Sequence, residues 1–296
     1  MAAIEAAARQ AGRALQPGDA GALLPLSAEA GWNQTADDWR FMLETGQGIG
    51  VVDRDGRFIA SALAFPVATD VCWISMVLTT ERWRRQGIGT RLLRRAIGLA
   101  RTGGRGAAGR VAGLDATELG APIYAALGFR ALYSLRRWRL ERGAAPMPPP
   151  SGVSIRKMRR EDLPAIAAFD AARSALRRPH VVAHLFARAP DLAQVAEADG
   201  RVVGYGLGRD GRIAMQIGPI VADDEGVALA LVAAAAQATT APLFLDVPDL
   251  HAGLRHYLTE AGGTAPRGFT RMVLGDAPAG LGDASRVFAL AGPELA

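Results

Sequence analysis

The spacing of apolar and polar residues predicts two helices near the start of the chain. Residues 20–30 and 35–44 have the pattern expected of helices. Thr35 or Asp37 can cap the second helix, because a side-chain oxygen at that point accepts a hydrogen bond from a free amide of the first turn. Two helices therefore precede the first clear β-signal.

Strand-like segments follow these helices. The turn signal Asp55-Gly56-Arg57 separates two of them and predicts a hairpin. Residues 71–78 form an almost continuous apolar run, which predicts a strand buried on both faces. The expected strands are residues 50–52, 58–65, 71–78, 110–114 and 130–140.

Two more helices are expected between the later strands. Residues 87–100 carry apolar side chains at helical spacing. Residues 119–127 predict a short helix that ends at Gly128, where a left-handed C-cap is least costly. This alternation predicts an α/β (α+β) fold, in which helices pack on a mixed sheet.

The second half of the chain repeats the first half in the same order. The turn Asp55-Gly56-Arg57 recurs at residues 199–201, the strand at 73–78 recurs at 216–221, and the pair Leu114-Asp115 recurs at 245–246. The segment ERGAAPMPPPSG between the halves is typical of a stiff, extended connector. We therefore predict a tandem repeat of one α/β domain, with domains at residues 1–141 and 153–296 and a proline-rich linker at 142–152.

The composition is that of a globular protein. Of the 296 residues, 50% are hydrophobic and 21% are charged, which supplies enough apolar surface for a core. Cys72 is the single cysteine, so an intramolecular disulfide is excluded. The longest apolar run, residues 227–236, is about half of the ~20 residues that a membrane span needs, and the N-terminal residues lack a secretory signal. We expect a cytoplasmic protein without a membrane partner.

The positive charge is spread along the chain. The formal net charge is +5, and Lys157 is the one lysine among 34 basic residues. The arginines alternate with acidic residues, and only 6% of the chain is aromatic, whereas nucleic-acid binders gather basic residues on one face. We therefore expect no nucleic-acid partner.

The segment VLTTERWRRQGIGT at residues 77–90 carries the most informative pattern. A buried strand ends there, and a loop with two arginines and two glycines leads into a helix. Glycine lets a backbone approach an anion closely, and the free amides of a helix start attract negative charge. The pattern favours a pyrophosphate site, although a tight turn alone would also explain the glycines. It lacks the Gly-Lys-Ser/Thr of a nucleotide-triphosphate loop and the third glycine of a dinucleotide fingerprint.

Two motifs in this region resemble one family. The run Arg84-Arg85-Gln86-Gly87-Ile88-Gly89 resembles the R/Q-x-x-G-x-G/A loop of the GNAT (GCN5-related) N-acetyltransferases, and residues 123–129 (IYAALGF) resemble their Y-x-x-L-G-F segment. The chain from about residue 12 onward further resembles a two-domain bacterial subgroup, on the strength of residues 31–35, 114–117, 244–248 and 288–295. The resemblance implies tandem GNAT-like domains, each a mixed, mostly antiparallel twisted sheet flanked by helices, with a first strand near residues 13–15.

The resemblance also implies roles for individual residues. The backbone of the strand end would bind the pantetheine arm of acetyl-CoA like an added strand. The helix-start loop would hold the pyrophosphate. Tyr124 would protonate the departing thiolate, for which a phenol is a plausible donor. The implied cofactor-binding residues are Val77, Leu78, Thr79, Arg84, Arg85, Gln86, Gly87, Ile88, Gly89 and Thr90.

The sequence identifies the residues that bind the acceptor less clearly than those that bind the cofactor. Trp32, Asn33 and Gln34, near Trp39, either shape an acceptor pocket or serve as a helix cap with core tryptophans. Asp115 and Asp246 are further candidates for contact with the acceptor. The general base is open among Asp115, Glu118, Glu81 and a carboxylate that acts through water.

The cysteine and one pair of histidines are expected to have structural roles. Cys72 lies on the buried strand without a histidine in its own repeat, which favours a core residue over a nucleophile. His180 and His184 have the i, i+4 spacing of zinc ligands but lack the glutamate of H-E-x-x-H, so no metal is expected.

The second copy departs from the cofactor pattern. Asp223, Asp224 and Glu225 stand where the first copy has its arginines and glycines, and acidic side chains there disfavour a pyrophosphate. Arg255 stands at the position of Tyr124. We expect a degenerate domain without cofactor that braces the first copy, in which Asp246, Asp249, His251 or Arg255 could face the acceptor.

Three functions remain open at this point. The first is an acetyl-CoA-dependent N-acetyltransferase that acts on a primary amine of a small molecule by direct transfer. The second keeps this chemistry with a protein or peptide amine as acceptor. The third is a non-catalytic acyl-CoA sensor, against which the retained Tyr124 argues. A homodimer is an open option for the assembly.

Overall fold

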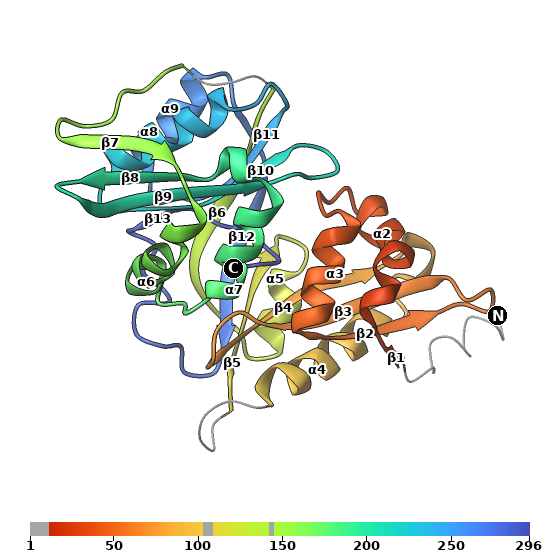
Figure 1. The fold of residues 1–296 in the computed structure, drawn as a ribbon. Coiled ribbons are helices and arrows are strands. Elements are labelled where there is room, and N and C mark those ends of the chain that lie inside the picture. The colour runs from red at the N-terminus through yellow and green to blue at the C-terminus, as the bar shows by residue number, and fades with distance from the viewer. Residues whose placement is uncertain (1–11, 103–108, 142–144) are drawn as a thin grey trace. The chain divides into compact units, whose positions relative to one another are not determined.

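The computed structural model describes residues 12–102, 109–141 and 145–296. The chain forms two compact units, Met1–Leu114 and Asp115–Ala296 (Figure 1). This division precedes the last helix and strand of the first repeat, whereas the sequence places a domain boundary in the proline-rich segment. The domains at residues 1–141 and 153–296 therefore stay a prediction. They follow the sequence repeats, whereas the compact units divide the chain after Leu114.

The first unit contains a sheet whose strands follow one another in chain order. Its neighbours are antiparallel except for the last pair, which is parallel at Val71 to Trp73. The strands are β1 (Arg13–Ala14), β2 (Gln47–Val52), β3 (Phe58–Pro66), β4 (Val71–Thr79) and β5 (Val111–Thr117), of which β5 runs across the division between the units. The expected first strand, central strand and hairpin are all confirmed.

Helices pack on both faces of this sheet (Figure 1). Thr35 caps the second of them, because its side chain accepts a hydrogen bond from the Asp38 amide while the Asp38 carboxylate accepts one from the Thr35 amide. The buried face of α4 carries the predicted apolar residues, including Leu92, Leu93 and Ala96. The helices are α2 (Ala20–Glu29), α3 (Ala36–Thr45) and α4 (Ile88–Arg101), with short 3-10 turns η1 (Pro17–Asp19) and η2 (Glu81–Trp83).

The second unit contains a sheet in the order β12-β6-β11-β10-β9-β8-β7, with β13 paired to β10. All its pairs are antiparallel except β10 with β11. Its strands are β6 (Arg130–Leu140), β7 (Val153–Lys157), β8 (Gln194–Ala198), β9 (Arg201–Arg209), β10 (Met215–Ala222), β11 (Leu243–Pro248), β12 (Thr264–Leu274) and β13 (Val287–Ala289). Its helices are α5 (Ala121–Ala126), α6 (Leu163–Ser174), α7 (Pro179–Arg188), α8 (Glu225–Gln237) and α9 (Ala252–Glu260), with turns η3 (Arg160–Asp162) and η4 (Pro190–Leu192).

Strand β6 belongs to the first repeat in sequence but lies inside the sheet of the second. It pairs with β11, where Trp138 faces Leu245, and with β12, where Leu135 faces Phe269. Residues 135–139 of β6 therefore lie between two partner strands from the second repeat. This insertion explains why the compact units and the sequence repeats divide the chain at different points.

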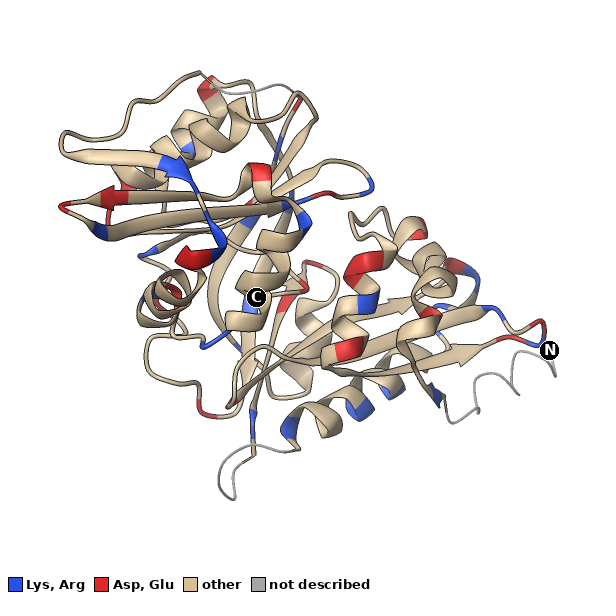
Figure 2. Cartoon of the chain, in the orientation of Figure 1, with Lys and Arg blue, Asp and Glu red and all other residues tan. Residues whose placement is uncertain are grey.

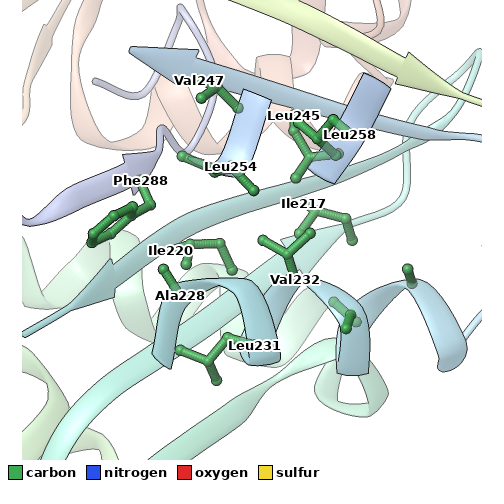
Figure 3. Packing of buried hydrophobic residues seen from close by; sticks show 14 of the residues in the cluster. Ile217, Ile220, Ala228, Leu231, Val232, Leu245, Val247, Leu254, Leu258 and Phe288 are labelled. Atoms are coloured by element: carbon green, nitrogen blue, oxygen red, sulfur yellow. The ribbon is translucent and has the colours of Figure 1, made fainter. Parts of the chain in front are cut away.

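The core of the second unit lies between its sheet and the helices α8 and α9. Figure 3 shows Ile217 and Ile220 of β10 beside Leu231 and Val232 of α8. Helix α8 is alanine-rich and mostly buried, so it packs closely on the sheet. Both units are mixed, mostly antiparallel sheets with helices on them, and this confirms the predicted fold class.

The charges are distributed as the sequence suggests. Figure 2 marks basic residues on many elements of both units, and α4 carries Arg91, Arg94, Arg95 and Arg101. Within the described part of the chain, no helix is both long and apolar enough for a membrane span.

Candidate active site

The end of strand β4 is bent by a β-bulge. Opposite β3, Leu78 faces Ser61 and Ser75 faces Leu63, so Met76 and Val77 share one partner position. Met76 adopts a left-handed φ of 51°, which is uncommon for a residue with a side chain. Its carbonyl oxygen accepts a hydrogen bond from the buried Ser61 hydroxyl, 2.8 Å away. The bulge is therefore held by a specific side chain.

The same part of β4 leaves its parallel neighbour. The pairing of β4 with β5 covers Val71 to Trp73 and ends where Trp73 faces Gly113. A side chain at Gly113 would collide with the Trp73 ring, so glycine is needed at this last paired position. The predicted pantetheine-binding residues lie beyond the end of this pairing: Val77 is in the bulge, and Leu78 and Thr79 follow it.

The loop after β4 leads into a helix start with open amides. Gly87 is the N-cap of α4, with a left-handed φ of 72°, and no side chain caps the helix there. An added Cβ at Gly89 would lie 3.1 Å from the Thr79 hydroxyl oxygen, so this glycine permits a tight turn next to β4. Open amides at the positive end of a fourteen-residue helix suit an anion.

The basic side chains of this loop are exposed. Arg84 donates from Nε to the Thr79 carbonyl oxygen, 3.1 Å away, which fastens the loop to the end of β4. Arg85 has a left-handed φ of 61°. Gln86, Ile88 and Thr90 complete the predicted loop, with Ile88 buried and the other two half-buried. The predicted cofactor-binding residues of the first unit thus form one continuous backbone feature.

Tyr124 lies on α5 of the second unit. Its ring meets Phe129 edge-on at 5.9 Å between centroids, and an added Cβ at Gly120 would lie 2.7 Å from its ring. Burial raises the pKa of Tyr124 to about 12, so the phenol keeps its proton at neutral pH. Gly128 has the predicted left-handed φ, at 90°. Tyr124 is therefore a protonated group in a fixed orientation, as a general acid requires.

Asp115 is not a free carboxylate. Arg271 of β12 donates to both of its oxygens, from Nε at 2.9 Å and from Nη2 at 2.8 Å, and both side chains are buried. Burial raises the pKa of Asp115, which the Arg271 charge opposes and the Asp246 carboxylate reinforces. This bidentate pair favours a structural role over that of a general base.

Asp246 is held in the same way. Arg137 of β6 donates to its two oxygens at 2.9 and 2.7 Å, and the Gln216 amide donates to it at 3.0 Å. All three side chains are buried. The two arginines are partners that sequence reasoning did not identify. A signal was present, since each arginine is the eighth residue of the strand that follows the last helix of its repeat.

The predicted acceptor cluster lies between α2 and α3. Asn33 and Gln34 are buried, and Gln34 Oε1 has no hydrogen-bond partner among the described residues. Trp32 is half-buried. Trp39 is a fully buried core residue whose Nε1 donates to the Ser27 hydroxyl at 3.1 Å. Gln34 therefore offers a hydrogen-bond acceptor, whereas Trp39 belongs to the core.

The other reactive residues have structural surroundings. Cys72 is buried on β4, and burial raises the pKa of its thiol to about 12, so it is not poised as a thiolate nucleophile. Within residues 12–102, 109–141 and 145–296, no cluster of three or more histidine, cysteine or carboxylate side chains is placed to hold a metal ion.

In the second repeat, the three acidic residues take donors from their own unit. Asp224 is the N-cap of α8 and accepts a hydrogen bond from the Val227 amide at 2.9 Å. Asp223 pairs with Arg173, and Glu225 accepts from the Leu254 amide. This helix start is therefore capped from within, in contrast to that of α4.

Comparisons with known proteins agree with this architecture. The sequence model described as the acetyltransferase (GNAT) family matches residues 23–129, and the one described as the acetyltransferase (GNAT) domain matches residues 166–289. The chain is 24% identical over 241 residues to the uncharacterized N-acetyltransferase YitH of Bacillus subtilis, which covers 81% of this chain and 83% of that protein.

Solved structures share the fold over almost the whole chain. A crystal structure from Pyrococcus horikoshii, assigned as an acetyltransferase, superposes with a TM-score of 0.75 at 19% identity and covers 95% of this chain and 94% of its own. A tandem GNAT protein from the clavulanic acid biosynthesis pathway has a TM-score of 0.58 at 17% identity, with 90% and 98% covered. The chain is therefore an N-acetyltransferase of the GNAT superfamily that carries two GNAT domains in tandem.

Proposed function

We propose that the protein transfers the acetyl group of acetyl-CoA directly to a primary amine of a small molecule, with its site in the first GNAT domain. The observation that carries this proposal is the bulged end of β4 followed by the uncapped start of α4. The backbone of Val77, Leu78 and Thr79 would hold the pantetheine arm as an added strand. The loop from Arg84 to Thr90 would hold the pyrophosphate through its amides and its two arginines.

The chemical step needs a proton donor for the leaving group. When bound, acetyl-CoA supplies an acyl carbon joined to sulfur. Attack by the amine nitrogen on this carbon forms a C–N bond and breaks the C–S bond. The Tyr124 hydroxyl gives its proton to the departing thiolate, and the excess proton on the nitrogen leaves to solvent or to a base. The high pKa of Tyr124, about 12, supports this role because a phenolate would have no proton to give.

The acceptor would be bound in part by the segment between α2 and α3. Gln34 Oε1 is a buried hydrogen-bond acceptor without a partner in the described structure, and an amine is a donor that matches it. Asn33 and Trp32 lie next to it in the chain. Asp115 and Asp246 support the second unit through their arginines, so we propose that their influence on the acceptor is indirect.

The test is thiol release from acetyl-CoA with a broad panel of small amines, amino acids and polyamines. We expect release with one amine class, and we expect a Gln34→Leu variant to raise KM for that amine more than it lowers kcat. If only proteins or peptides accept the acetyl group, the small-molecule assignment is wrong. If the protein binds coenzyme A but no acceptor supports turnover, a sensor function replaces catalysis.

A further inference from the structure

A strand from the end of the described chain lies in a gap of the second sheet. The parallel pairing of β10 with β11 covers Met215 to Ile217. Beyond it, β13 pairs with β10, where Ala289 faces Ile220. On its other side, the Leu290 amide donates to the Asp246 carbonyl oxygen of β11 at 2.9 Å. Residues 286–290 therefore fill the space where β10 and β11 no longer pair.

This gap corresponds to the proposed pantetheine site of the first repeat. There, β4 stops pairing with β5 after Trp73 and then bulges. In the second repeat, β10 stops pairing with β11 after Ile217, and its register against β9 shifts between Ile217 and Ile220. In both repeats this strand therefore stops pairing and then bulges, within one residue of the equivalent position. The repeats differ in that residues 286–290 of the chain occupy the gap in the second repeat.

The strand fits this gap closely. A side chain at Gly218 would collide with the main-chain oxygen of Leu290, and its φ of 145° is one that other residues rarely adopt. Phe288 points into the core of the unit, near Ile220 and Leu254 (Figure 3). Glycine in β10 and an aromatic anchor in β13 are features of a dedicated binding groove.

A histidine and two buried arginines hold residues 284–296, which include the strand in the gap. The His251 ring stacks on Phe288 with centroids 4.1 Å apart, and its Nε2 lies 2.9 and 3.0 Å from the carbonyl oxygens of Ala284 and Val287. Further along, Glu294 pairs with the buried Arg209. The main-chain oxygen of Ala296 accepts a hydrogen bond from the buried Arg178. The segment is therefore fastened along its length by side chains from several elements.

We propose that the second GNAT domain is a peptide-binding groove whose occupant is residues 286–290 of the same chain, in the position that the first domain keeps for a pantetheine arm. Asp224 caps the start of α8, whereas the equivalent start of α4 is uncapped and is the proposed pyrophosphate site. The occupant adds a short strand to β10, so main-chain hydrogen bonds and the Phe288 pocket provide the recognition. Because the second site is filled, the chain binds one coenzyme A molecule. This stoichiometry rests on the function proposed for the first domain.

The test separates the segment from the covalent chain and asks whether it stays bound. A protease recognition sequence is inserted between Gly275 and Asp276, both of which are exposed, and the full-length protein is then cleaved. We expect the released fragment to co-elute with the rest of the protein in size-exclusion chromatography. Ala289→Glu places a charge in the gap and should release the fragment. Ser285→Glu places the same charge at an exposed position of the same fragment, just before residues 286–290, and the fragment should stay bound.

Two results would overturn the proposal. One is loss of the fragment from the cleaved, unsubstituted protein while the remainder keeps its circular dichroism spectrum. The other is a calorimetric stoichiometry of two coenzyme A molecules per intact chain. If no coenzyme A binds at all, the proposed function fails, but retention of the fragment still tests the groove separately. Slow exchange of the Leu290 amide hydrogen, lost in the Ala289→Glu variant, checks the groove without any ligand.

Discussion

Arg271 of the second repeat donates two hydrogen bonds to Asp115 of the first, and Arg137 of the first repeat does the same for Asp246 of the second. Each arginine lies on the strand that follows the last helix of its repeat, and each aspartate follows the leucine of the repeated Leu-Asp pair. Each repeat therefore supplies the charge that neutralises a buried carboxylate of the other. These reciprocal pairs accompany the insertion of β6 between β11 and β12.

We expect Arg271→Met to lower the free energy of unfolding by about 3–5 kcal/mol, because it leaves the Asp115 carboxylate buried without a partner. Arg271→Met combined with Asp115→Leu should cost much less, since no unpaired charge remains. Urea unfolding curves give both values. Lys157→Met is the control, because its pair with Asp191 is exposed and should add little. Equal losses in the single and double variants would contradict this account.

Gly87→Val should weaken coenzyme A binding about tenfold or more, equivalent to about 1.4 kcal/mol. Gly87 has a φ of 72°, and a β-branched residue there would shift the amides of the α4 start. Gly56→Val is a matched control, since Gly56 has a φ of 78° and equally open surroundings but lies in the β2–β3 hairpin turn. Calorimetric titration should show normal affinity in this control. If both variants bind normally, the loop does not hold the pyrophosphate.

Tyr124→Phe should lower kcat about a hundredfold or more, the range typical of a lost general acid, with a smaller change in KM. Because the pKa of Tyr124 is about 12, the unsubstituted enzyme should show no alkaline decline from this group until the pH approaches that value. Tyr257→Phe, which removes the hydroxyl of a buried tyrosine elsewhere in the second unit, is the control and should retain kcat. Steady-state thiol release over a pH series measures all three. Full activity in Tyr124→Phe would assign the proton donor elsewhere.

Much of the fold follows from local patterns in the sequence. Thr35 caps α3 and Gly128 takes its left-handed φ because both effects depend on a few neighbouring residues. The apolar run of β4 likewise identifies a buried strand. The position of β6 between β11 and β12 has no local signal, because strand pairing depends on residues more than a hundred positions away.

The candidate site likewise has features that are visible in the local sequence and features that depend on distant residues. The loop after β4 is visible in sequence because its glycines and arginines are contiguous. The β4 bulge depends on Ser61, a buried serine on a neighbouring strand whose role emerges only once the two strands pair. The position of strand β13 in the second gap is equally non-local. In the sequence, the acidic residues at 223–225 and Arg255 were therefore the signals that predicted a second copy without cofactor.

The stability of the protein should fall as the pH drops below about 6.5, and His251 should account for part of this loss. Burial lowers the pKa of His251 below its ordinary value of 6.5, which hydrogen bonds to Val287 and Ala284 and the charge of Glu225 partly oppose. The unfolded chain then binds this proton at a higher pH than the folded chain, so acid favours unfolding. His251→Gln should reduce the slope of unfolding free energy against pH between about pH 7 and pH 5. Urea unfolding at a series of pH values measures this slope, and an unchanged slope in His251→Gln would contradict the prediction.

A fragment of residues 1–141 should not fold alone, although its sequence contains a whole repeat. Its last strand, β6, has both of its partners, β11 and β12, in the second repeat, so the fragment would expose two unpaired edges. A fragment of residues 145–296 would lack the strand between β11 and β12. Co-expressed fragments of residues 1–144 and 145–296 should therefore assemble and elute together, whereas each alone should aggregate. A monodisperse 1–141 fragment with cooperative unfolding would show that β6 is dispensable to the first repeat, and that the compact units are not the units of folding.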